Sequence, residues 1–189
     1  MDNSLASNSG MYAQILGTQW SKVAESVRRL HDPRGVHAVG SFRVRGGNRL
    51  ARFLAWLGRL PTACDAVSLR LTVSPLLTDR EQWLRLFGQV PFKTLQWAND
   101  GCLVERVSRS ETHLKLDAID GALHYRTRCV ALRLGPLRFQ LPRWLAPRVT
   151  ASETQEGAGL RIHVDVVLPI VGLLIAYDGV LTRIETNPW

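Results

Sequence analysis

The sequence predicts a mainly β protein of the α+β class: a strongly curved antiparallel sheet or partly closed β-barrel with two helices near the N-terminus. Apolar and polar residues alternate over many short segments, turn signals separate those segments at hairpin spacing, and helical periodicity is confined to the first third of the chain. Strands joined by tight turns pair in antiparallel fashion. A sheet of nine or ten such strands that curls on itself commonly encloses a cavity.

The N-terminal region contains the first predicted helix. Residues 1–10 contain Asn, Ser and Gly and are expected to form a flexible N-terminus. From Met11 to Leu30 apolar side chains recur at helical spacing, and Pro33 and Gly35 then stop the helix. No linker, low-complexity segment or internal repeat follows, so residues 11–189 are predicted to form a single antiparallel β-sheet domain.

A strand and a second helix come next. From Val36 to Arg45 apolar and polar residues alternate with a period of two, which predicts a strand. Asn48 is suited to cap a helix that continues to about Leu60, before Pro61. The apolar residues along one side of this helix are Leu50, Phe53, Leu54 and Leu57. The dry face of the sheet must be covered by helices or by closure of the sheet on itself.

The rest of the chain is predicted to be almost entirely strands. Hairpin turns are expected at residues 89–91, at Asn99-Asp100-Gly101 and at Asp120-Gly121. Residues 134–147 are rich in proline and are expected to be an irregular loop with one short helical turn around Trp144. The predicted strands are 67–73, 82–88, 92–98, 102–107, 113–118, 122–132, 149–155, 160–168 and 173–184.

The charge distribution bears on the partners of the protein. The net charge is +8, but the 24 basic residues are spread along the chain without a clustered run or a stripe interleaved with aromatics. Nucleic-acid binders usually cluster charge to neutralise several phosphates at once. Nucleic-acid binding is therefore not expected, and neither is loose contact with anionic membrane surfaces.

Cysteine usage and hydropathy bear on the compartment. The three cysteines form no CxxC pair, which argues against a disulfide framework and a zinc site and predicts buried or half-buried thiols. The longest apolar stretch, 164–176, is interrupted by Asp165 and Pro169 and is too short to cross a bilayer, so no transmembrane segment is expected. With no visible secretory signal, the expected location is cytoplasmic.

Several segments in a fixed order resemble a bacterial family known as domain of unknown function 4166, over about residues 11–185. The segments include WLRLFG at 83–88 and LVER at 103–106. The best match is the C-terminal part, with LPRWLAPR at 141–148, LPIVG at 168–172 and YDGVL at 177–181. The resemblance implies an auxiliary role beside redox chemistry and an oxidoreductase partner, because the domain also occurs fused to Rossmann-type oxidoreductase or epimerase-like domains. It supplies no catalytic residues. Val107-Ser108-Arg109 replaces a glycine-containing turn that the family pattern has, which predicts a local difference in a loop or pocket rim.

The standard catalytic and cofactor signatures are absent from the sequence. It contains no GxGxxG after a strand, no GxxxxGK[ST], no HExxH and no GxSxG. No cofactor and no metal are therefore predicted, and the catalytic residues, if there are any, remain unknown.

A group of aromatic and charged residues is the candidate ligand-binding site. Trp83 and Arg85 share one face of a predicted strand, Trp97 lies on the next strand, and Glu105 can reach Arg85 if the three strands are neighbours. An Arg–Glu pair beside two tryptophans is suited to anchor an apolar or aromatic molecule, and a structural salt bridge under an aromatic cluster is the alternative.

Two further residues belong to this candidate site. Tyr177 is expected to point inward, where its hydroxyl either meets a ligand or makes it a core tyrosine. Arg148, together with Arg143, flanks Trp144 in the proline-rich loop, which is suited to be a pocket lid or a docking patch.

The histidines offer weaker alternatives. The side chains of His163 and Asp165 project from the same face of a predicted strand, where they could hold a metal or act as base and orienter. A solvated surface pair fits their polar face better. His113 and His124 lie on adjacent predicted strands and could meet across the hairpin, but two histidines make a poor metal site.

Three functional hypotheses follow. The preferred one is a binding module that holds a hydrophobic or aromatic small molecule in a β-sheet cavity, auxiliary to a Rossmann-type oxidoreductase. The second is a cofactor-free isomerase, cyclase or hydrolase that acts in the same cavity. The third is a structural or protein-interaction domain with a filled core.

Overall fold

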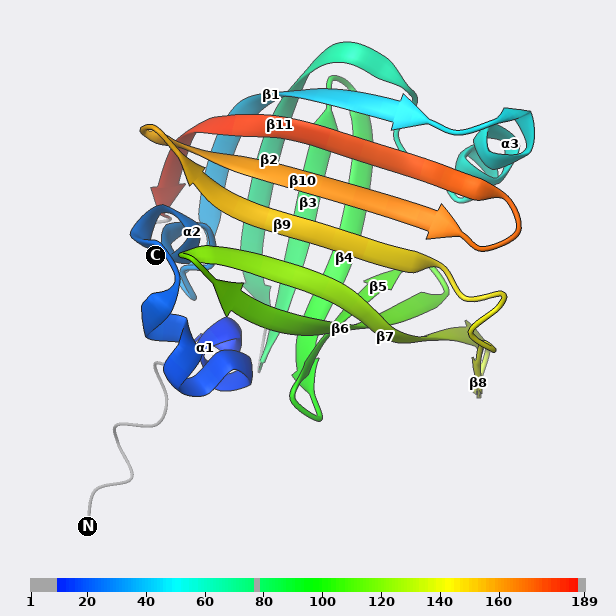
Figure 1. Cartoon of the computed structure of the whole chain (residues 1–189), viewed down its shortest axis with the longest axis horizontal. Coiled ribbons are helices and arrows are strands. Elements are labelled where there is room, and N and C mark those ends of the chain that lie inside the picture. The colour runs from blue at the N-terminus through cyan, green and yellow to red at the C-terminus, as the bar shows by residue number, and fades with distance from the viewer. Residues whose placement is uncertain (1–9, 77–78, 187–189) are drawn as a thin grey trace.

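The structure is a closed antiparallel β-barrel with helices at both ends (Figure 1). The computed structural model describes residues 10–76 and 79–186, so the N-terminus expected to be flexible lies outside the described residues except for Gly10. In chain order the elements are α1 (Met11–Leu16), the 3-10 segment η1 (Gly17–Lys22), α2 (Glu25–Leu30), β1 (Val36–Gly46), α3 (Arg49–Leu57), β2 (Cys64–Leu76), β3 (Arg80–Phe87), β4 (Val90–Asn99), β5 (Cys102–Val107), β6 (Ser110–Ile119), β7 (Ala122–Leu134), β8 (Leu137–Gln140), β9 (Arg148–Glu156), β10 (Gly159–Leu168) and β11 (Gly172–Thr186).

The barrel closes through pairing of the first and last strands. Ten strands form the ring, in the order β6-β5-β4-β3-β2-β1-β11-β10-β9-β7 with β7 again paired to β6, and β8 adds to the edge of β7. The mainly β class predicted from the sequence is confirmed, but the sheet is closed rather than open or partly closed. Closure satisfies the main-chain donors and acceptors of β1 and β11, which an open sheet would leave exposed at its edges.

Two glycines allow β1 and β11 to approach each other. A Cβ atom at Gly40 would lie 2.2 Å from the carbonyl oxygen of Val180, and one at Gly179 would lie 2.3 Å from that of Ser41. The register between the two strands also shifts between Val39 and Gly40, which marks a β-bulge. We call the pairing of β1 with β11 the seam of the barrel. Only glycine fits at these two positions of the seam without displacing backbone.

The first predicted helix is broken into three parts that close one end of the barrel (Figure 1). Gly17 adopts φ 55, which ends α1, and the chain continues as η1 before α2 begins. The helical spacing nonetheless places the apolar residues on one buried side, because Tyr12, Leu16 and Val27 pack against the barrel interior. The prediction of two N-terminal helices was therefore only approximate.

The second predicted helix, α3, is confirmed, but the side that it was expected to bury is exposed. The side chain of Asn48 accepts a hydrogen bond of 2.9 Å from the Ala51 amide, which caps the helix as expected. Within α3 only Ala51 is buried. The exposed apolar residues of the helix are Leu50, Phe53, Trp56 and Leu57.

The turn predictions are mostly confirmed. Asp100 and Gly101 have φ 49 and 67, and Asp120 and Gly121 have φ 50 and 80, the left-handed conformations that two-residue hairpin turns require. The turn between β3 and β4 is shorter than predicted, because Phe87 pairs directly with Val90.

The proline-rich segment and the cysteines differ in part from expectation. Residues 134–147 include the short strand β8, so the segment is not wholly irregular. The predicted turn near Trp144 is present, since the Ala146 amide donates to the Pro142 carbonyl at 2.9 Å. Cys102 is buried and Cys129 is half-buried, but Cys64 is exposed, contrary to the prediction. None of the helices in the described residues is long and apolar enough to span a membrane.

Candidate functional site

The barrel is closed by α1 and α2 at one end and opens into an apolar mouth at the other. The mouth has a volume of about 640 Å³ and lies between α3, the β5–β6 turn, the segment before β9 and the two strands β10 and β11. Its apolar lining residues are Leu54, Leu57, Leu60, Pro61, Phe92, Val107, Leu132, Leu141, Pro147, Val149, Val164, Val166, Leu168, Leu174, Ile175 and Tyr177. The size and the aliphatic walls are typical of a site for a small apolar molecule.

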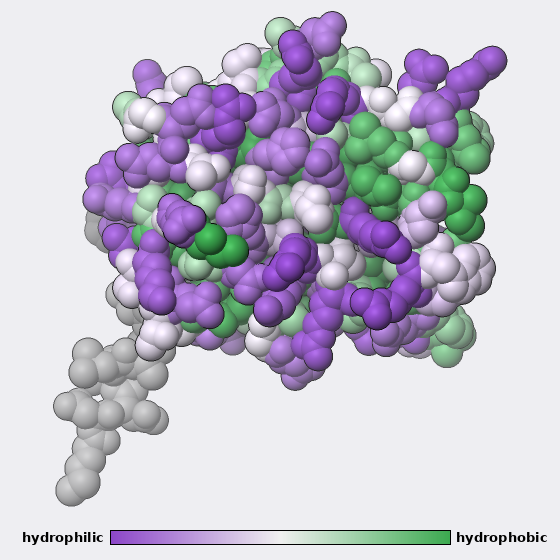
Figure 2. Space-filling model, viewed as in Figure 1, coloured by the Kyte–Doolittle hydropathy of each residue, from purple (hydrophilic) through white to green (hydrophobic). Residues whose placement is uncertain are grey.

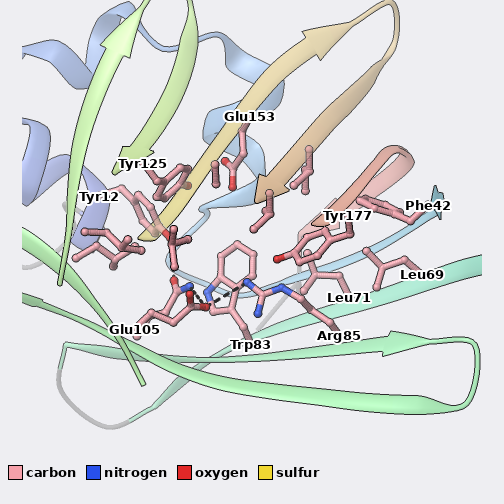
Figure 3. Close-up of a pocket in the computed structure, with 17 residues that line it drawn as sticks. Tyr12, Phe42, Leu69, Leu71, Trp83, Arg85, Glu105, Tyr125, Glu153 and Tyr177 are labelled. Atoms are coloured by element: carbon pink, nitrogen blue, oxygen red, sulfur yellow. Dashed lines mark hydrogen bonds and ion pairs between the residues drawn. The ribbon is translucent and has the colours of Figure 1, made fainter. Parts of the chain in front are cut away.

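A second, smaller cavity lies deeper in the lumen (Figure 3). Its volume is about 50 Å³, room for a ligand group of only a few atoms. The mouth and this inner cavity share Glu105, Val149, Val164 and Tyr177 in their walls, so the two spaces adjoin. Together they form a lumen that is apolar at its entrance and polar at its inner end.

Arg85 is the central polar residue of the inner cavity (Figure 3). Its guanidinium donates to Thr94 Oγ1 at 3.1 Å and contacts Glu105 Oε1 at 3.5 Å. It also lies over the ring of Trp83, 4.9 Å from the ring centroid, and 5.7 Å from that of Phe92. Alternation along β3 places Trp83 and Arg85 on the inner face, and both are buried.

A chain of buried hydrogen bonds connects this arginine site to the first helix. The Gln96 amide donates to Glu105 Oε1 at 3.0 Å, and the Tyr12 hydroxyl donates to Gln96 Oε1 at 2.8 Å. Gln96 and Glu105 face each other across β4 and β5. Helix α1 is thereby fixed to the inner end of the lumen through Tyr12.

A histidine–carboxylate pair lies beside this chain. His31 Nε2 is 2.6 Å from Glu153 Oε2 and 3.3 Å from the hydroxyl of Tyr125, and the His31 ring stacks on Tyr12 with centroids 3.7 Å apart. Glu153 and Tyr125 line the inner cavity, whereas His31 lies behind them and is 2% exposed. His31 Nδ1 is buried without a hydrogen-bond partner among the described residues. The pair places a carboxyl group in the cavity wall with a buried histidine behind it to orient it.

Burial and charge displace the pKa values of several lumen groups. Burial raises the pKa of the Glu81 carboxyl, and this effect outweighs the opposite effects of His31 and of the Trp83 indole, which donates to Glu81 at 3.1 Å. Burial also raises the pKa of Tyr177 to about 12, although the charge of Arg85 opposes the shift. Desolvation would lower the pKa of Arg85, but attraction to Tyr177 and to the lumen carboxylates raises it overall, so Arg85 stays charged.

Comparison with known proteins places the chain in a family. A family model described as a domain of unknown function, DUF4166, matches residues 23–181. The chain belongs to the DUF4166 family. No curated protein and no solved structure gives a significant match. The resemblance identified from the sequence is confirmed, and the matched range includes every lumen residue described above except Tyr12.

Four of the six site residues predicted from the sequence come together in the lumen of this DUF4166 domain. They are Trp83, Arg85, Glu105 and Tyr177, all in the wall of the inner cavity. Tyr177 points inward as expected, and its hydroxyl makes no hydrogen bond to another described residue. Their role in ligand binding stays a prediction.

The structure does not place Trp97 and Arg148 with them. Trp97 pairs with Arg80 across β3 and β4, on the outer face of the barrel, where its ring lies 5.2 Å from the Arg80 guanidinium and 5.6 Å from that of Arg106. Arg148 is exposed at the start of β9 and lines a separate cleft outside the lumen. The loop before it, with Leu141 and Pro147, does form part of the mouth.

Several lumen residues were not predicted. Thr94, Gln96, Tyr125 and Glu153 are polar residues within strands that alternate regularly, and the alternation alone does not show which face is inside. His31 was not predicted to be a site residue. The register of the β3–β4 hairpin would have identified Thr94 and Gln96, because they lie opposite Trp83 and Glu81.

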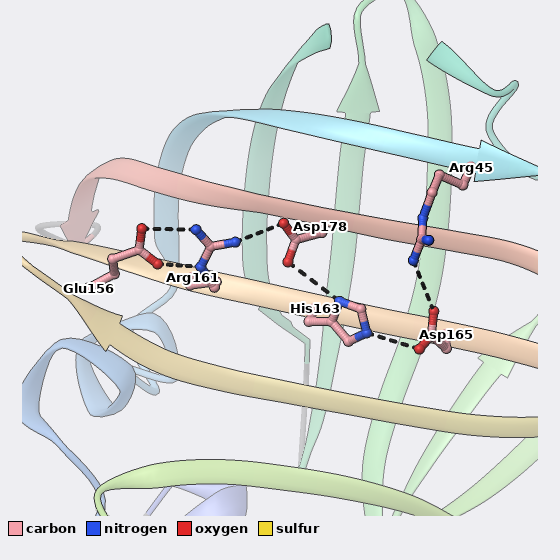
Figure 4. Close-up of polar contacts among 6 residues, drawn as sticks. All are labelled: Arg45, Glu156, Arg161, His163, Asp165 and Asp178. Carbon is pink, nitrogen blue, oxygen red and sulfur yellow. Dashed lines mark hydrogen bonds and ion pairs between the residues drawn. The ribbon is translucent and has the colours of Figure 1, made fainter. Parts of the chain in front are cut away.

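The histidines considered as alternatives lie outside the lumen. His163 contacts Asp165 at 2.9 Å and Asp178 at 3.4 Å within an ion-pair network on the outer face of β10 and β11 (Figure 4). His113 and His124 do not meet, since His113 lies opposite Cys129 and His124 opposite Asp117. No group of three or more His, Cys, Asp or Glu within the described residues is arranged to hold a metal.

The turn that departs from the family pattern lies at the mouth. Ser108 takes φ 53 in the β5–β6 turn, a conformation that glycine adopts without strain, and both Ser108 and Arg109 line the opening. The predicted local difference thus falls on the rim of the pocket.

Proposed function

We propose that this domain binds an apolar or aromatic small molecule in its lumen, with an uncharged hydrogen-bonding end of the ligand at Arg85 and Tyr177. The observation that carries the proposal is the adjoining pair of cavities, an aliphatic mouth of about 640 Å³ above a polar cavity of about 50 Å³. Apolar walls supply affinity and a small number of placed polar groups supply orientation. Closed barrels of this kind commonly hold one small ligand.

The charges of the lumen favour a neutral polar end over a carboxylate. The positive charge of Arg85 is already compensated by Glu105, and Glu153 adds a second carboxyl group to the same wall. An anionic ligand would meet these acids in a desolvated space, at high energetic cost. The Tyr177 hydroxyl has no partner among the described residues and is free to bond a ligand hydroxyl or carbonyl oxygen.

The proposal includes a role beside an oxidoreductase. Its support is the family's occurrence with Rossmann-type domains, together with the absence of a dinucleotide fingerprint in this chain. A neutral ketone or alcohol is a substrate or product of hydride transfer, so such a ligand fits a carrier or auxiliary domain of that chemistry.

The test is a binding panel read out by intrinsic tryptophan fluorescence and thermal shift. Each aromatic or long-chain ketone and alcohol is paired with the hydrocarbon that lacks its oxygen and with the matching carboxylic acid. We expect the neutral oxygenated member to bind most tightly and Tyr177→Phe to weaken it about tenfold, the loss of one hydrogen bond, with little effect on the hydrocarbon. Trp97→Phe, on the outer face, is the matched control and should change neither affinity. A panel without quenching or thermal shift would leave only a structural or protein-interaction role.

A second candidate function rests on the His31–Glu153 pair. Glu153 and Tyr125 reach the cavity wall and His31 supports them from behind, an arrangement suited to remove a proton next to a bound carbonyl. A cofactor-free isomerase or cyclase would exchange carbon-bound hydrogens of a bound ketone with solvent deuterium. Exchange that is lost in Glu153→Gln while binding persists would favour the enzyme, and binding without exchange favours the carrier.

A further inference from the structure

The mouth is surrounded by apolar side chains that no other described residue covers. They come from α3, from the segment between β7 and β9, and from the β10–β11 turn, and Figure 2 shows hydrophobic surface gathered at the end of the molecule where α3 lies. The most exposed are Trp56 at 72%, Ile170 at 72%, Leu57 at 65% and Trp144 at 63%. A contiguous apolar surface of this kind marks an interaction site.

These segments lie at one opening rather than on separate faces. Leu57 of α3, Leu141 before Trp144 and Leu168 before Ile170 all line the same mouth. The Asn48 side chain also donates to the Val171 carbonyl at 2.9 Å, which fixes the start of α3 to the β10–β11 turn. The exposed residues therefore form one rim, which we call the mouth rim and define as segments 48–63, 133–148 and 168–172.

The charge of the mouth rim is entirely of one sign. Segment 48–63 contains three arginines, segment 133–148 contains four, and neither contains Asp or Glu. The arginines of the rim that make no ion pair with another described residue are Arg49, Arg52, Arg59, Arg143 and Arg148. Arg143 and Arg148 also line a cleft of about 600 Å³ between β7 and β9, to which Arg128 contributes one more guanidinium group. The Arg126 guanidinium in the same cleft already pairs with Asp117 at 2.7 Å. This cleft can accept the phosphate of a headgroup beside the apolar rim.

We propose that the mouth rim docks on the surface of an anionic lipid bilayer, with Trp56, Trp144 and Ile170 inserted at the boundary between headgroups and acyl chains. Helix α3 combines tryptophan, phenylalanine and leucine with arginine and no acidic residue, the composition of helices that lie in a membrane interface. The arginines of the rim would lie close to the bilayer surface, where its negative surface potential attracts them. A second copy of the chain is a poorer occupant, because two rims of the same positive charge repel each other.

Docking at this place would open the lumen directly toward the bilayer. The rim surrounds the mouth, and the mouth adjoins the inner cavity through residues that line both spaces. An apolar ligand could therefore pass from the membrane into the lumen without crossing water. The docking proposal goes beyond the proposed ligand-binding function and does not depend on it, since it rests on the outer surface alone.

The experiment is flotation of the full chain with phosphatidylcholine vesicles that contain or lack phosphatidylglycerol. We expect flotation only with the anionic vesicles, and a decrease as salt concentration rises. The double substitution Arg52→Gln and Arg143→Gln should weaken partitioning about 25-fold, about fivefold for each arginine. Trp56→Ser with Trp144→Ser should weaken it at both low and high salt.

Matched controls lie away from the rim. Arg70→Gln removes an exposed arginine from the barrel wall, and Ile119→Ser removes an exposed apolar residue, 53% exposed, at the closed end. Both variants should float like the unsubstituted chain, and so should Tyr177→Phe, which separates docking from ligand binding. Equal flotation on both vesicle types would overturn the proposal. Equal losses in the control variants, or a dimer that the rim substitutions dissociate, would overturn it as well.

Discussion

Arg85 and Glu105 contact each other at 3.5 Å although β4 lies between their strands. Both side chains project into the lumen, where Arg85 is 11% and Glu105 19% exposed. Gln96 of the intervening strand donates to the same Glu105 oxygen. The contact therefore spans three strands and fixes the polar end of the lumen.

Loss of one member of this pair should be more damaging than loss of both. Arg85→Met leaves the Glu105 carboxylate in a desolvated site and should lower the free energy of unfolding by about 3 kcal/mol. Adding Glu105→Leu to Arg85→Met should restore part of that loss, because no uncompensated charge remains. Urea denaturation of the two single variants and the double variant measures the coupling. Strictly additive losses would show that the contact contributes nothing.

Glu81 should make stability depend on pH. Burial raises the pKa of the Glu81 carboxyl in the folded protein above the ordinary value of 4.5. The folded protein therefore holds this proton more tightly than the unfolded chain does. This contribution is fully present below about pH 4.5 and is lost as pH rises through the raised folded pKa. We expect Glu81→Gln, which keeps an acceptor for the Trp83 indole, to remove that decline. The difference between the two stability–pH curves, measured by denaturation, isolates Glu81 from other carboxyl groups. A difference that does not change with pH would contradict the expectation.

His31 should be essential to the packing of α2 on the barrel. His31→Leu would leave Glu153 buried without its closest partner, and we expect a loss of about 3 kcal/mol in the free energy of unfolding. His31→Gln retains a donor and should lose less. Asp32→Asn, one residue along the chain in an ion pair with the exposed Arg34, is the control and should lose no more than about 1 kcal/mol. Equal losses in His31→Leu and Asp32→Asn would argue against a role of the buried pair.

Gly179→Ala should destabilise the seam between β1 and β11. The new methyl group would lie within 2.4 Å of the Phe42 ring and closer still to the Ser41 carbonyl oxygen, so backbone must move. Overpacking of this kind costs about 1–3 kcal/mol. Gly46→Ala, on β1 but with its nearest contact at 3.4 Å, is the matched control, and thermal denaturation compares the two. Similar melting temperatures for the two variants would contradict the expectation.

The fold was largely predictable because its signals are local. Asp100-Gly101 and Asp120-Gly121 define two hairpins by turn chemistry alone, and the alternation in β2 and β10 defines their faces. Closure of the sheet was not predictable, since it depends on close backbone contacts between strands from opposite ends of the chain, of Gly40 with Val180 and of Gly179 with Ser41.

The candidate site was predictable only in part, for reasons of register. A one-residue difference in the register of a hairpin exchanges the two faces of a strand. The turn after Phe87 is two residues long, which puts Thr94 and Gln96 opposite Trp83 and Glu81 and turns Trp97 outward.

Helix α3 illustrates a different limit of the sequence. Its amphipathic pattern predicts the helix correctly, but the pattern is the same whether the apolar side contacts a core or remains on the surface. Only the structure shows that Phe53 and Trp56 remain exposed.

The β1–β11 seam also has a consequence for the order in which the protein folds. Val36 pairs with Thr186, whereas nearly all other strand pairs join neighbours along the chain. Bringing such distant segments together carries a large loop-closure entropy, so the local hairpins should form before the ring is completed. Substitutions at the seam should then accelerate unfolding and leave the refolding rate almost unchanged, whereas substitutions in the β4–β5 hairpin should slow refolding.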